Sequence, residues 1–301
     1  MEIFNSANEY FKRRFGAKAY KIALDGGMSC PNRNKENKGG CIFCSEGGSG
    51  DFAEKNYGDI NEQIERAILR VIDKKPKKFI AYFQSYTNTY APIEYLKSVF
   101  YPAVTHSKIC ALSIATRPDC LDGEVVRLLE NLNKIKPVFI ELGLQTTNDT
   151  TAKKINRGYK TEVYFDAVKR LKAVGLSVIT HVIIGLPDED ENDLLNTVDA
   201  VNKSGCDGVK LQLLHILQNT VLNKIYEEGK YLPLEKEQYF KLLSLCIRSL
   251  KPEIVIHRIT GDAPKKILVE PKWSADKKKV LNELNKYFKE NGVRQGDLYK
   301  L

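Results

Sequence analysis

The strongest constraint on the fold of this chain is a series of short strand-like segments that recur about every 30 residues. Each is rich in β-branched and aromatic residues, and apolar residues at helical spacing separate them. The segments are Phe79–Phe83, Ile109–Ala115, Val138–Leu142, Ser177–Ile184 and Gly208–Leu214. Because a strand–helix–strand unit occupies about 30 residues, the pattern predicts a parallel α/β sheet covered by helices.

The number of repeats limits how far such a sheet can close. With Tyr20–Leu24 as an additional first strand, the chain has six strand–helix units, fewer than the eight of a closed TIM barrel. We therefore expect a partial, open (β/α)6 TIM-like barrel over residues 1–216 and a C-terminal α/β extension over 217–301. The helices and the strand expected in the extension are 217–229, 235–250, Glu253–His257 and 276–290.

Composition narrows the class of protein. With 301 residues, 43% of them hydrophobic, the chain can bury a substantial core. No basic segment followed by an apolar run begins the chain, and no stretch reaches the roughly 18 apolar residues of a membrane span. We expect a cytoplasmic protein without a membrane partner. The formal charge of +9 suggests a polyanionic partner, although many basic proteins bind no nucleic acid.

Three cysteines carry the clearest chemical signal. Cys30, Cys41 and Cys44 form a C-x10-C-x2-C pattern in a loop after the first predicted strand. Three thiolates can hold three irons of a four-iron cluster and leave the fourth iron open to another ligand. A structural zinc site completed by a histidine, or incidental cysteines, are alternative interpretations. The other four cysteines are scattered singly and are predicted to be small core residues.

Polar residues follow the predicted strands at their carboxyl ends, where parallel sheets gather reactive groups. These segments are Gln84–Tyr90, Thr116–Asp119, Gly143–Gln145, Gly185–Asp188 and His215. Ordinary turn chemistry can also explain each of them, because loops are polar and Gly and Pro favour turns. Their shared position nevertheless predicts a site at this edge of the sheet.

Several motifs occur in a fixed order along the chain. They are the cysteine loop, Phe83–Tyr90, Ala115–Asp119, Glu141–Gln145, Asn156–Gly158 and His181–Pro187. In this combination the chain resembles the YtqA/YhcC-type radical S-adenosylmethionine (SAM) proteins. That group is similar to the radical SAM domain of the Elongator catalytic subunit and, more distantly, to oxygen-independent coproporphyrinogen oxidase. The first cysteine gap is longer than the commonest C-x3-C-x2-C spacing of the superfamily, as it is in the Elongator-like branch.

The resemblance implies a cofactor pair. Cys30, Cys41 and Cys44 would ligate a [4Fe–4S] cluster whose open iron binds SAM. One electron, from a donor such as flavodoxin or ferredoxin, would cleave SAM to methionine and a 5′-deoxyadenosyl radical that abstracts a substrate hydrogen. The protein would orient these groups and exclude water.

The resemblance also implies a set of SAM-binding residues. Residues 84–89 would receive the SAM amino group, Gln145 and Arg157 its ribose and carboxylate, and Gly185 and Leu186 its adenine. The full set is Gln84, Thr87, Asn88, Thr89, Arg117, Gln145, Arg157, His181, Gly185 and Leu186. Each has a structural alternative, such as an ordinary hydrogen bond of the barrel, an Arg117–Asp119 pair or a core histidine.

Substrate contacts are expected at the barrel mouth. Lys210 and His215, placed on the last barrel strand, are the candidate catalytic residues, and the segment His257–Asp262 is a second group that a solvated loop would equally explain. Three lysine-rich stretches could bind phosphates, namely 74–78, 265–266 and 277–279. The Elongator-like branch acts on the wobble uridine of tRNA. The resemblance therefore implies a tRNA-modifying enzyme that converts a carboxymethylaminomethyl group at C5 toward aminomethyl. Radical chemistry on a small metabolite and a zinc-bearing RNA-binding module are the alternatives.

Overall fold

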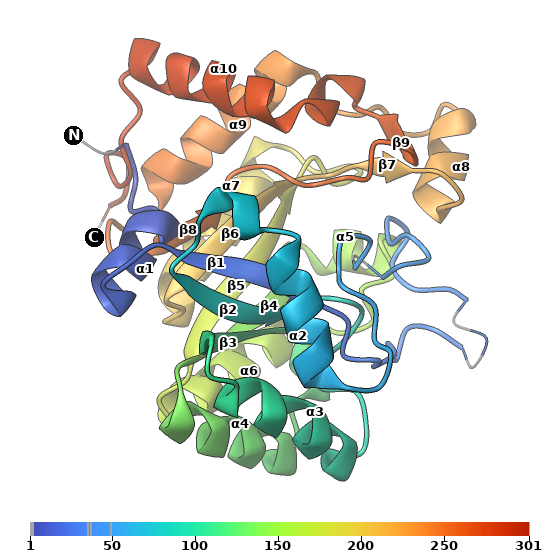
Figure 1. Cartoon of the computed structure of the whole chain (residues 1–301). Coiled ribbons are helices and arrows are strands. Elements are labelled where there is room, and N and C mark those ends of the chain that lie inside the picture. The colour runs from blue at the N-terminus through green and yellow to red at the C-terminus, as the bar shows by residue number, and fades with distance from the viewer. Residues whose placement is uncertain (1–2, 35, 37, 49, 301) are drawn as a thin grey trace.

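The computed structural model describes residues 3–34, 36, 38–48 and 50–300. Its central element is a seven-stranded parallel sheet that curls into an open half-barrel (Figure 1). In sheet order the strands are β1 (Ala19–Leu24), β2 (Lys78–Phe83), β3 (Ile109–Thr116), β4 (Val138–Gln145), β5 (Ser177–Ile184), β6 (Gly208–Leu213) and β8 (Val255–Arg258). The predicted α/β partial barrel is confirmed, with β1 and β8 at the two ends of the sheet.

The sheet has one strand more than the six of the predicted barrel. The segment Glu253–His257, which we expected as a strand of the extension, instead contributes β8 and pairs in parallel with β6, Val209 opposite Ile256. The residues after 216 therefore take part in the same sheet as the residues before it. A separate two-stranded sheet joins β7 (Ile216–Leu217) to β9 (Leu268–Glu270).

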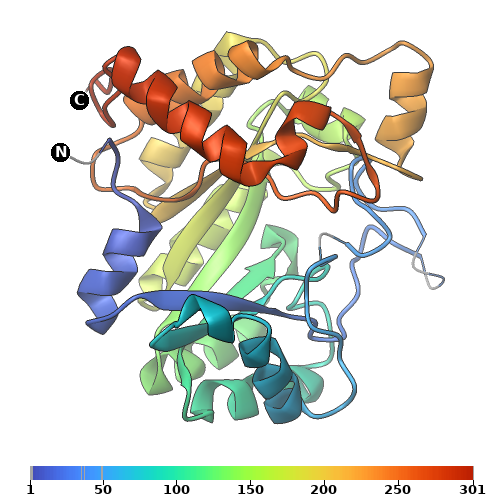
Figure 2. The ribbon, with the colours of Figure 1, turned by 45° about the horizontal axis from the view of Figure 1, so that its top comes forward.

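Helices cover the outer face of the sheet with the apolar stripes predicted from the sequence (Figure 2). The longer ones that follow or precede the strands are α2 (Ile60–Leu69), α3 (Ile93–Thr105), α4 (Gly123–Ile135), α6 (Thr161–Ala173), α7 (Glu191–Ser204) and α9 (Lys236–Ser249). Others are α1 (Ala7–Phe15), α5 (Asp149–Lys154), α8 (Val221–Glu227), α10 (Lys277–Glu290) and the short turns η1 (Ile72–Lys74), η2 (Pro118–Cys120) and η3 (Lys272–Ala275). Within the described ranges, no helix is both long and apolar enough to cross a bilayer.

The inside of the barrel is built in layers, because alternate residues of a strand point to the same face. The lowest layer is apolar and consists of Ile80, Ala111, Phe139 and Ile179, one from each of β2 to β5. Phe11 of α1 packs on these four residues and makes an edge-to-face contact with Phe139 at 5.6 Å between ring centroids. Helix α1 thus closes the amino-terminal end of the barrel.

Two residues further along the same strands, the interior becomes polar. This layer contains one side chain from each of six strands, Lys21, Tyr82, Ser113, Glu141, His181 and Lys210. The alternation places these polar groups between the apolar floor and the carboxyl ends of the strands. The fold therefore carries a polar layer directly toward the edge where the sequence predicts a site.

Candidate active site

The three predicted cluster ligands border one cavity at the carboxyl end of the barrel. Cys30, Cys41 and Cys44 line it together with side chains from β2, β3, β4, β5 and β6. Cys41 is hydrogen-bonded to Cys44, and this bond, together with burial, raises the pKa of the Cys41 thiol well above its usual value. Arg117 opposes this effect, because its positive charge favours the thiolate.

The donor set suits an iron–sulfur cluster. In the described part of the chain, no three His, Cys, Asp or Glu side chains form a group placed to hold a metal ion. A four-iron cluster binds each thiolate through a separate iron, so its ligands need not converge on one point. Three thiols around one cavity leave room for a fourth, non-protein ligand there.

The motif Asn156–Gly158 holds the cysteine loop against the barrel. Asn32, between the first two cysteines, donates from Nδ2 to the carbonyl oxygens of Asn156 at 2.6 Å and Arg157 at 3.0 Å, and Asn156 donates to the carbonyl of Gly40 at 2.7 Å. A Cβ at Gly158, where φ is 85°, would lie 2.4 Å from Oδ1 of Asn32. Glycine is therefore required for this close approach.

Arg157 itself is engaged with the protein. The side chain is 1% exposed, and its guanidinium donates to the carbonyls of Leu144, Thr146 and Tyr159 at 2.7–3.0 Å and to Asp149 at 3.0 Å. We expected it to contact the SAM carboxylate or ribose. Arg157 also borders the cavity with the three cysteines, but a contact with SAM would have to compete with these bonds, which fix the turn that holds the cysteine loop.

The segment after β2 divides into two parts. Gln84 and Thr87 border the cysteine cavity, as the predicted SAM contact requires. Asn88 and Thr89 are instead buried between strands: Asn88 donates to the carbonyls of Phe83 and Ala115, and Thr89 shares a 2.6 Å hydrogen bond with Thr116. These two residues stabilise the strand ends around the cavity.

Three further predicted contacts line the same cavity. Arg117 forms a two-bond ion pair with Asp119 at 2.7 and 2.9 Å and donates to the carbonyl of Arg157. Gln145 ends β4 with a φ of 62° and accepts a hydrogen bond from Tyr159. His181 completes the set from β5. The Arg117–Asp119 pair is the alternative to a cofactor contact that the sequence leaves open.

Glu141 is the centre of the polar layer. Its side chain is fully buried, accepts from Ser113 at 2.6 Å and from His181 at 2.9 Å, and forms ion pairs with Lys21 and Lys210. Burial alone would raise the pKa of Glu141, but the two lysines hold it well below its usual range. A carboxylate buried without such partners would be strongly destabilising.

The state of His181 follows from this network. Burial, followed by the charge of Lys210, lowers the pKa of His181 to about 4, so the ring is neutral at pH 7. Because an ionised Glu141 can only accept, Nε2 of His181 carries the hydrogen and donates to it at 2.9 Å. Nδ1 is therefore the hydrogen-bond acceptor of the His181 ring, and this ring borders the cavity that the three cysteines line.

The two candidate catalytic residues lie apart. Lys210, 3% exposed, is buried in the polar layer, where it donates to the Tyr82 hydroxyl at 2.9 Å. His215 is not on a barrel strand as expected, because β6 ends at Leu213 and the chain turns away to pair β7 with β9. It borders a neighbouring pocket, bonds Ser274 at 3.0 Å, and burial lowers its pKa to about 4.

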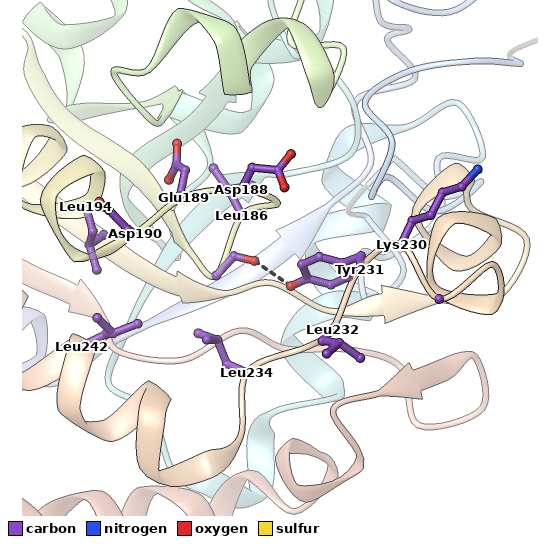
Figure 3. Close-up of a pocket in the computed structure, with 12 residues that line it drawn as sticks. Leu186, Asp188, Glu189, Asp190, Leu194, Lys230, Tyr231, Leu232, Leu234 and Leu242 are labelled. Carbon is purple, nitrogen blue, oxygen red and sulfur yellow. Dashed lines mark hydrogen bonds between the residues drawn. The ribbon is translucent and has the colours of Figure 1, made fainter.

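Gly185 and Leu186 lie in a separate pocket of about 370 Å³ (Figure 3). The hydroxyl of Tyr231 donates to the carbonyl of Gly185 at 2.6 Å, and a Cβ at this glycine would lie 2.8 Å from a methyl of Leu234. The turn therefore has a packing role. Ile183, two residues earlier, and Phe43, between the second and third cysteines, do border the cysteine cavity and offer apolar surface to a planar base.

Sequence reasoning missed Glu141, Lys21, Ser113 and Tyr82 as members of the polar layer. A usable signal was present, since a carboxylate and a hydroxyl inside otherwise apolar strands are unusual at buried positions. Lys21 gives no such signal, because β1 is half-exposed and a lysine there is ordinary.

Comparison with known proteins establishes the family. A model of the radical SAM superfamily matches residues 30–201, and a model of the Radical_SAM C-terminal domain matches residues 206–290. The chain belongs to the radical SAM superfamily. A radical SAM protein uses a [4Fe–4S] cluster and SAM, and Cys30, the first residue of the match, is the first cysteine of the pattern.

The relatives of this radical SAM protein confirm the resemblance. It is 40% identical to the Bacillus subtilis protein YtqA over 99% of this chain and 93% of that protein. It is 37% identical to YhcC of Escherichia coli strain K12 over 94% of this chain and 91% of that protein. The tRNA uridine(34) acetyltransferase of Methanocaldococcus jannaschii is 29% identical over 61% of this chain and 34% of its own length.

A solved structure confirms the fold. The archaeal Elp3 of Methanocaldococcus infernus superposes with a TM-score of 0.70 at 19% sequence identity. The match covers 92% of this chain and 64% of the Elp3 chain. The radical SAM barrel and most of the region after it therefore share one architecture with that protein.

Proposed function

We propose that this radical SAM enzyme modifies the C5 side chain of the wobble uridine of tRNA. The observation that carries the proposal is the similarity to the tRNA uridine(34) acetyltransferase of M. jannaschii, which extends over 190 residues at 29% identity. The conversion we propose is that of a carboxymethylaminomethyl group toward aminomethyl. A cytoplasmic location, next to tRNA and to a flavodoxin- or ferredoxin-type electron donor, fits this activity.

In this proposal the residues of the cavity have three roles: they bind the cluster, contact SAM or position another residue. Cys30, Cys41 and Cys44 hold the cluster, which together with SAM supplies a 5′-deoxyadenosyl radical when both are bound. Gln145 and the Nδ1 atom of His181 offer polar contacts to SAM at the cavity wall. Glu141 is a positioning residue, because it fixes the tautomer and orientation of His181 through a 2.9 Å hydrogen bond.

The charge of the cavity supports an anionic substrate group. The side chains that line the cavity include four arginines, Arg33, Arg117, Arg157 and Arg258, and a single carboxylate, Glu141. The aspartates that pair with Arg117, Arg157 and Arg258 stand outside this lining. The excess of positive charge would attract the carboxylate of a carboxymethyl group.

The substrate is tested by nucleoside analysis of tRNA from cells that lack the gene. The proposal expects a C5-modified wobble uridine to be missing there and restored by the wild-type gene but not by a Cys41→Ala variant. An unchanged nucleoside profile on deletion would contradict the tRNA substrate. The superfamily assignment would stand in that case, and a small metabolite would become the substrate to test.

A further inference from the structure

A second large cavity, of about 610 Å³, opens at the side of the barrel. It lies at the open edge of the sheet, lined by β1, by α2 and η1, and by Lys277 at the start of α10. Figure 2 shows β1 and α10 facing each other on this side of the molecule. We call it the lateral cavity.

The lateral cavity is strongly basic. Six of its lining residues are Lys or Arg and two are acidic, an excess of four positive charges. Arg70 is paired with Glu54 at 2.7 Å, and Asp262 is shared by Arg258 and Lys277. Lys18 and Lys74 have no acidic partner among the described residues, and both are exposed.

Two lysine-rich stretches that lie about 200 residues apart in sequence meet at this cavity. Lys74 begins the stretch 74–78 and Lys277 begins the stretch 277–279, and both side chains line the rim. The second stretch forms the first turn of α10, where the helix dipole disfavours positive charge. Helix stability therefore does not explain these lysines, whereas an anionic ligand would benefit from the lysines and from the dipole together.

An exposed aromatic residue stands beside the lysines. Phe52 is 53% exposed and borders both the lateral cavity and the pocket that His215 lines. A single exposed aromatic side chain is ordinary on a protein surface, but at the border of a basic cavity its ring offers a face on which a base can stack. Cations that follow a backbone and an aromatic face on which a base can stack are the combination that binds single-stranded nucleic acid.

The lateral cavity adjoins the cysteine cavity. Tyr82, Gln84 and Arg258 line both. These three side chains stand between the two cavities, so a group bound in the lateral cavity would lie against the wall of the cysteine cavity. A nucleic-acid duplex would be too wide to enter from this side. An unpaired base extruded from a loop would fit the chemistry of the lateral cavity.

We propose that the lateral cavity binds a single-stranded RNA segment, with Lys18, Lys74 and Lys277 on its phosphates and Phe52 stacked on a base. The inference rests on the proposed function, because it supplies the route by which the target nucleotide reaches the cysteine cavity. It goes further by assigning the RNA to one face of the molecule and by naming the residues that bind it.

The first test measures RNA binding, not catalysis. The affinity of the cluster-loaded protein for a fluorescent anticodon stem–loop is followed by anisotropy as the salt concentration is varied. A Lys18→Glu, Lys74→Glu, Lys277→Glu variant should bind about 10-fold more weakly or worse, and the slope of log K against log[salt] should fall by about 2, since each lost single-strand phosphate contact accounts for about 0.7.

A matched control carries the same change of charge on another face. Lys134, Lys169 and Lys203 are exposed lysines of α4, α6 and α7, and their triple change to Glu should leave the salt slope near that of the wild type. Iron content and melting temperature are compared for both variants. Equal loss of affinity in the two triple variants would overturn the inference, because total charge and not the lateral cavity would then explain binding.

Phe52 provides an independent readout. Phe52→Ala should weaken binding about 5- to 150-fold without changing the salt slope, whereas Phe52→Tyr should bind like the wild type, because stacking needs an aromatic face and not a charge. Full affinity in Phe52→Ala would overturn the inference. If the variants behave as expected but the tRNA nucleoside profile is unchanged in the deletion strain, the RNA site stands and the proposed reaction fails.

Discussion

At the scale of single residues, the contacts that matter most for stability are the two ion pairs that the buried carboxylate of Glu141 forms with Lys21 and Lys210. Replacing Glu141 by Gln leaves the shape of the side chain and removes its charge, so the buried Lys210 and the partly exposed Lys21 lose their counter-charge. We predict a loss of about 3–5 kcal/mol in the free energy of unfolding, measured by urea denaturation. A second change, Lys210→Met, should restore part of it, whereas a single variant as stable as the wild type would contradict the network.

Buried neutral histidines make stability depend on pH, because burial lowers the pKa of each of the four histidines. Burial lowers the pKa values of His181 and His215 to about 4, below the usual 6.5 of an unfolded histidine. Between those values the unfolded chain binds more protons than the folded one, so the free energy of unfolding rises with pH across this window. Each histidine contributes up to about 3 kcal/mol, fully present above pH 6.5 and lost as the pH falls toward 4.

The share of His215 in this pH dependence can be measured separately. A His215→Asn variant should lose part of the wild-type change in stability between pH 6.5 and 4, because His181 and His257 still differ in pKa between the folded and unfolded chain. Urea denaturation at several pH values measures it. An unchanged slope in this variant would mean that His215 is already protonated in the folded protein.

At the scale of elements, the turn at Asn156–Gly158 holds the cysteine loop. Arg157→Lys keeps the charge but loses the geometry that reaches three carbonyl oxygens, so we expect iron per chain to fall to about half or less after reconstitution. The matched comparison is Gln145→Ala, which should leave iron content unchanged and weaken SAM binding. Full iron content with weak SAM binding in Arg157→Lys would instead support the SAM contact predicted from the sequence.

The same elements show what the sequence could and could not reveal. The strands and covering helices were predictable, because period-2 and period-3.6 patterns come from local packing against one core. The cysteine cavity was predictable from strand order, since the carboxyl ends of parallel strands meet at one edge. The engagement of Arg157 and Thr89 with neighbouring backbone was not, because a hydrogen bond to a carbonyl depends on tertiary geometry and leaves no pattern in the chain.

At the scale of the whole molecule, the seventh strand joins the two ends of the chain. The carbonyl of Asn5 accepts a hydrogen bond from the amide of Ile256 in β8, and Gln295 donates to the carbonyl of Ile254. Strand β8 has only four residues, and its place beside β6 depends on these distant segments. A strand so short, paired through residues about 250 positions away, could be recognised as a strand from sequence but not assigned to the barrel.

The layers inside the barrel follow one another from the amino-terminal to the carboxyl end of the strands. Helix α1 closes the amino-terminal end, the polar layer around Glu141 follows, and the cavity with Cys30, Cys41 and Cys44 lies at the carboxyl end. The lateral cavity meets this arrangement from the side, at Gln84 and Arg258. In our proposal, the cofactors and the RNA therefore approach the site from different faces.

The most direct test of radical SAM chemistry on tRNA is the formation of 5′-deoxyadenosine by anaerobically reconstituted protein with SAM and a reductant, with and without undermodified tRNA. We expect product from the wild type, more of it when tRNA is present, and none from Cys41→Ala. Product that tRNA does not increase would contradict the tRNA substrate, and no product from fully iron-loaded protein would contradict radical SAM chemistry in this chain.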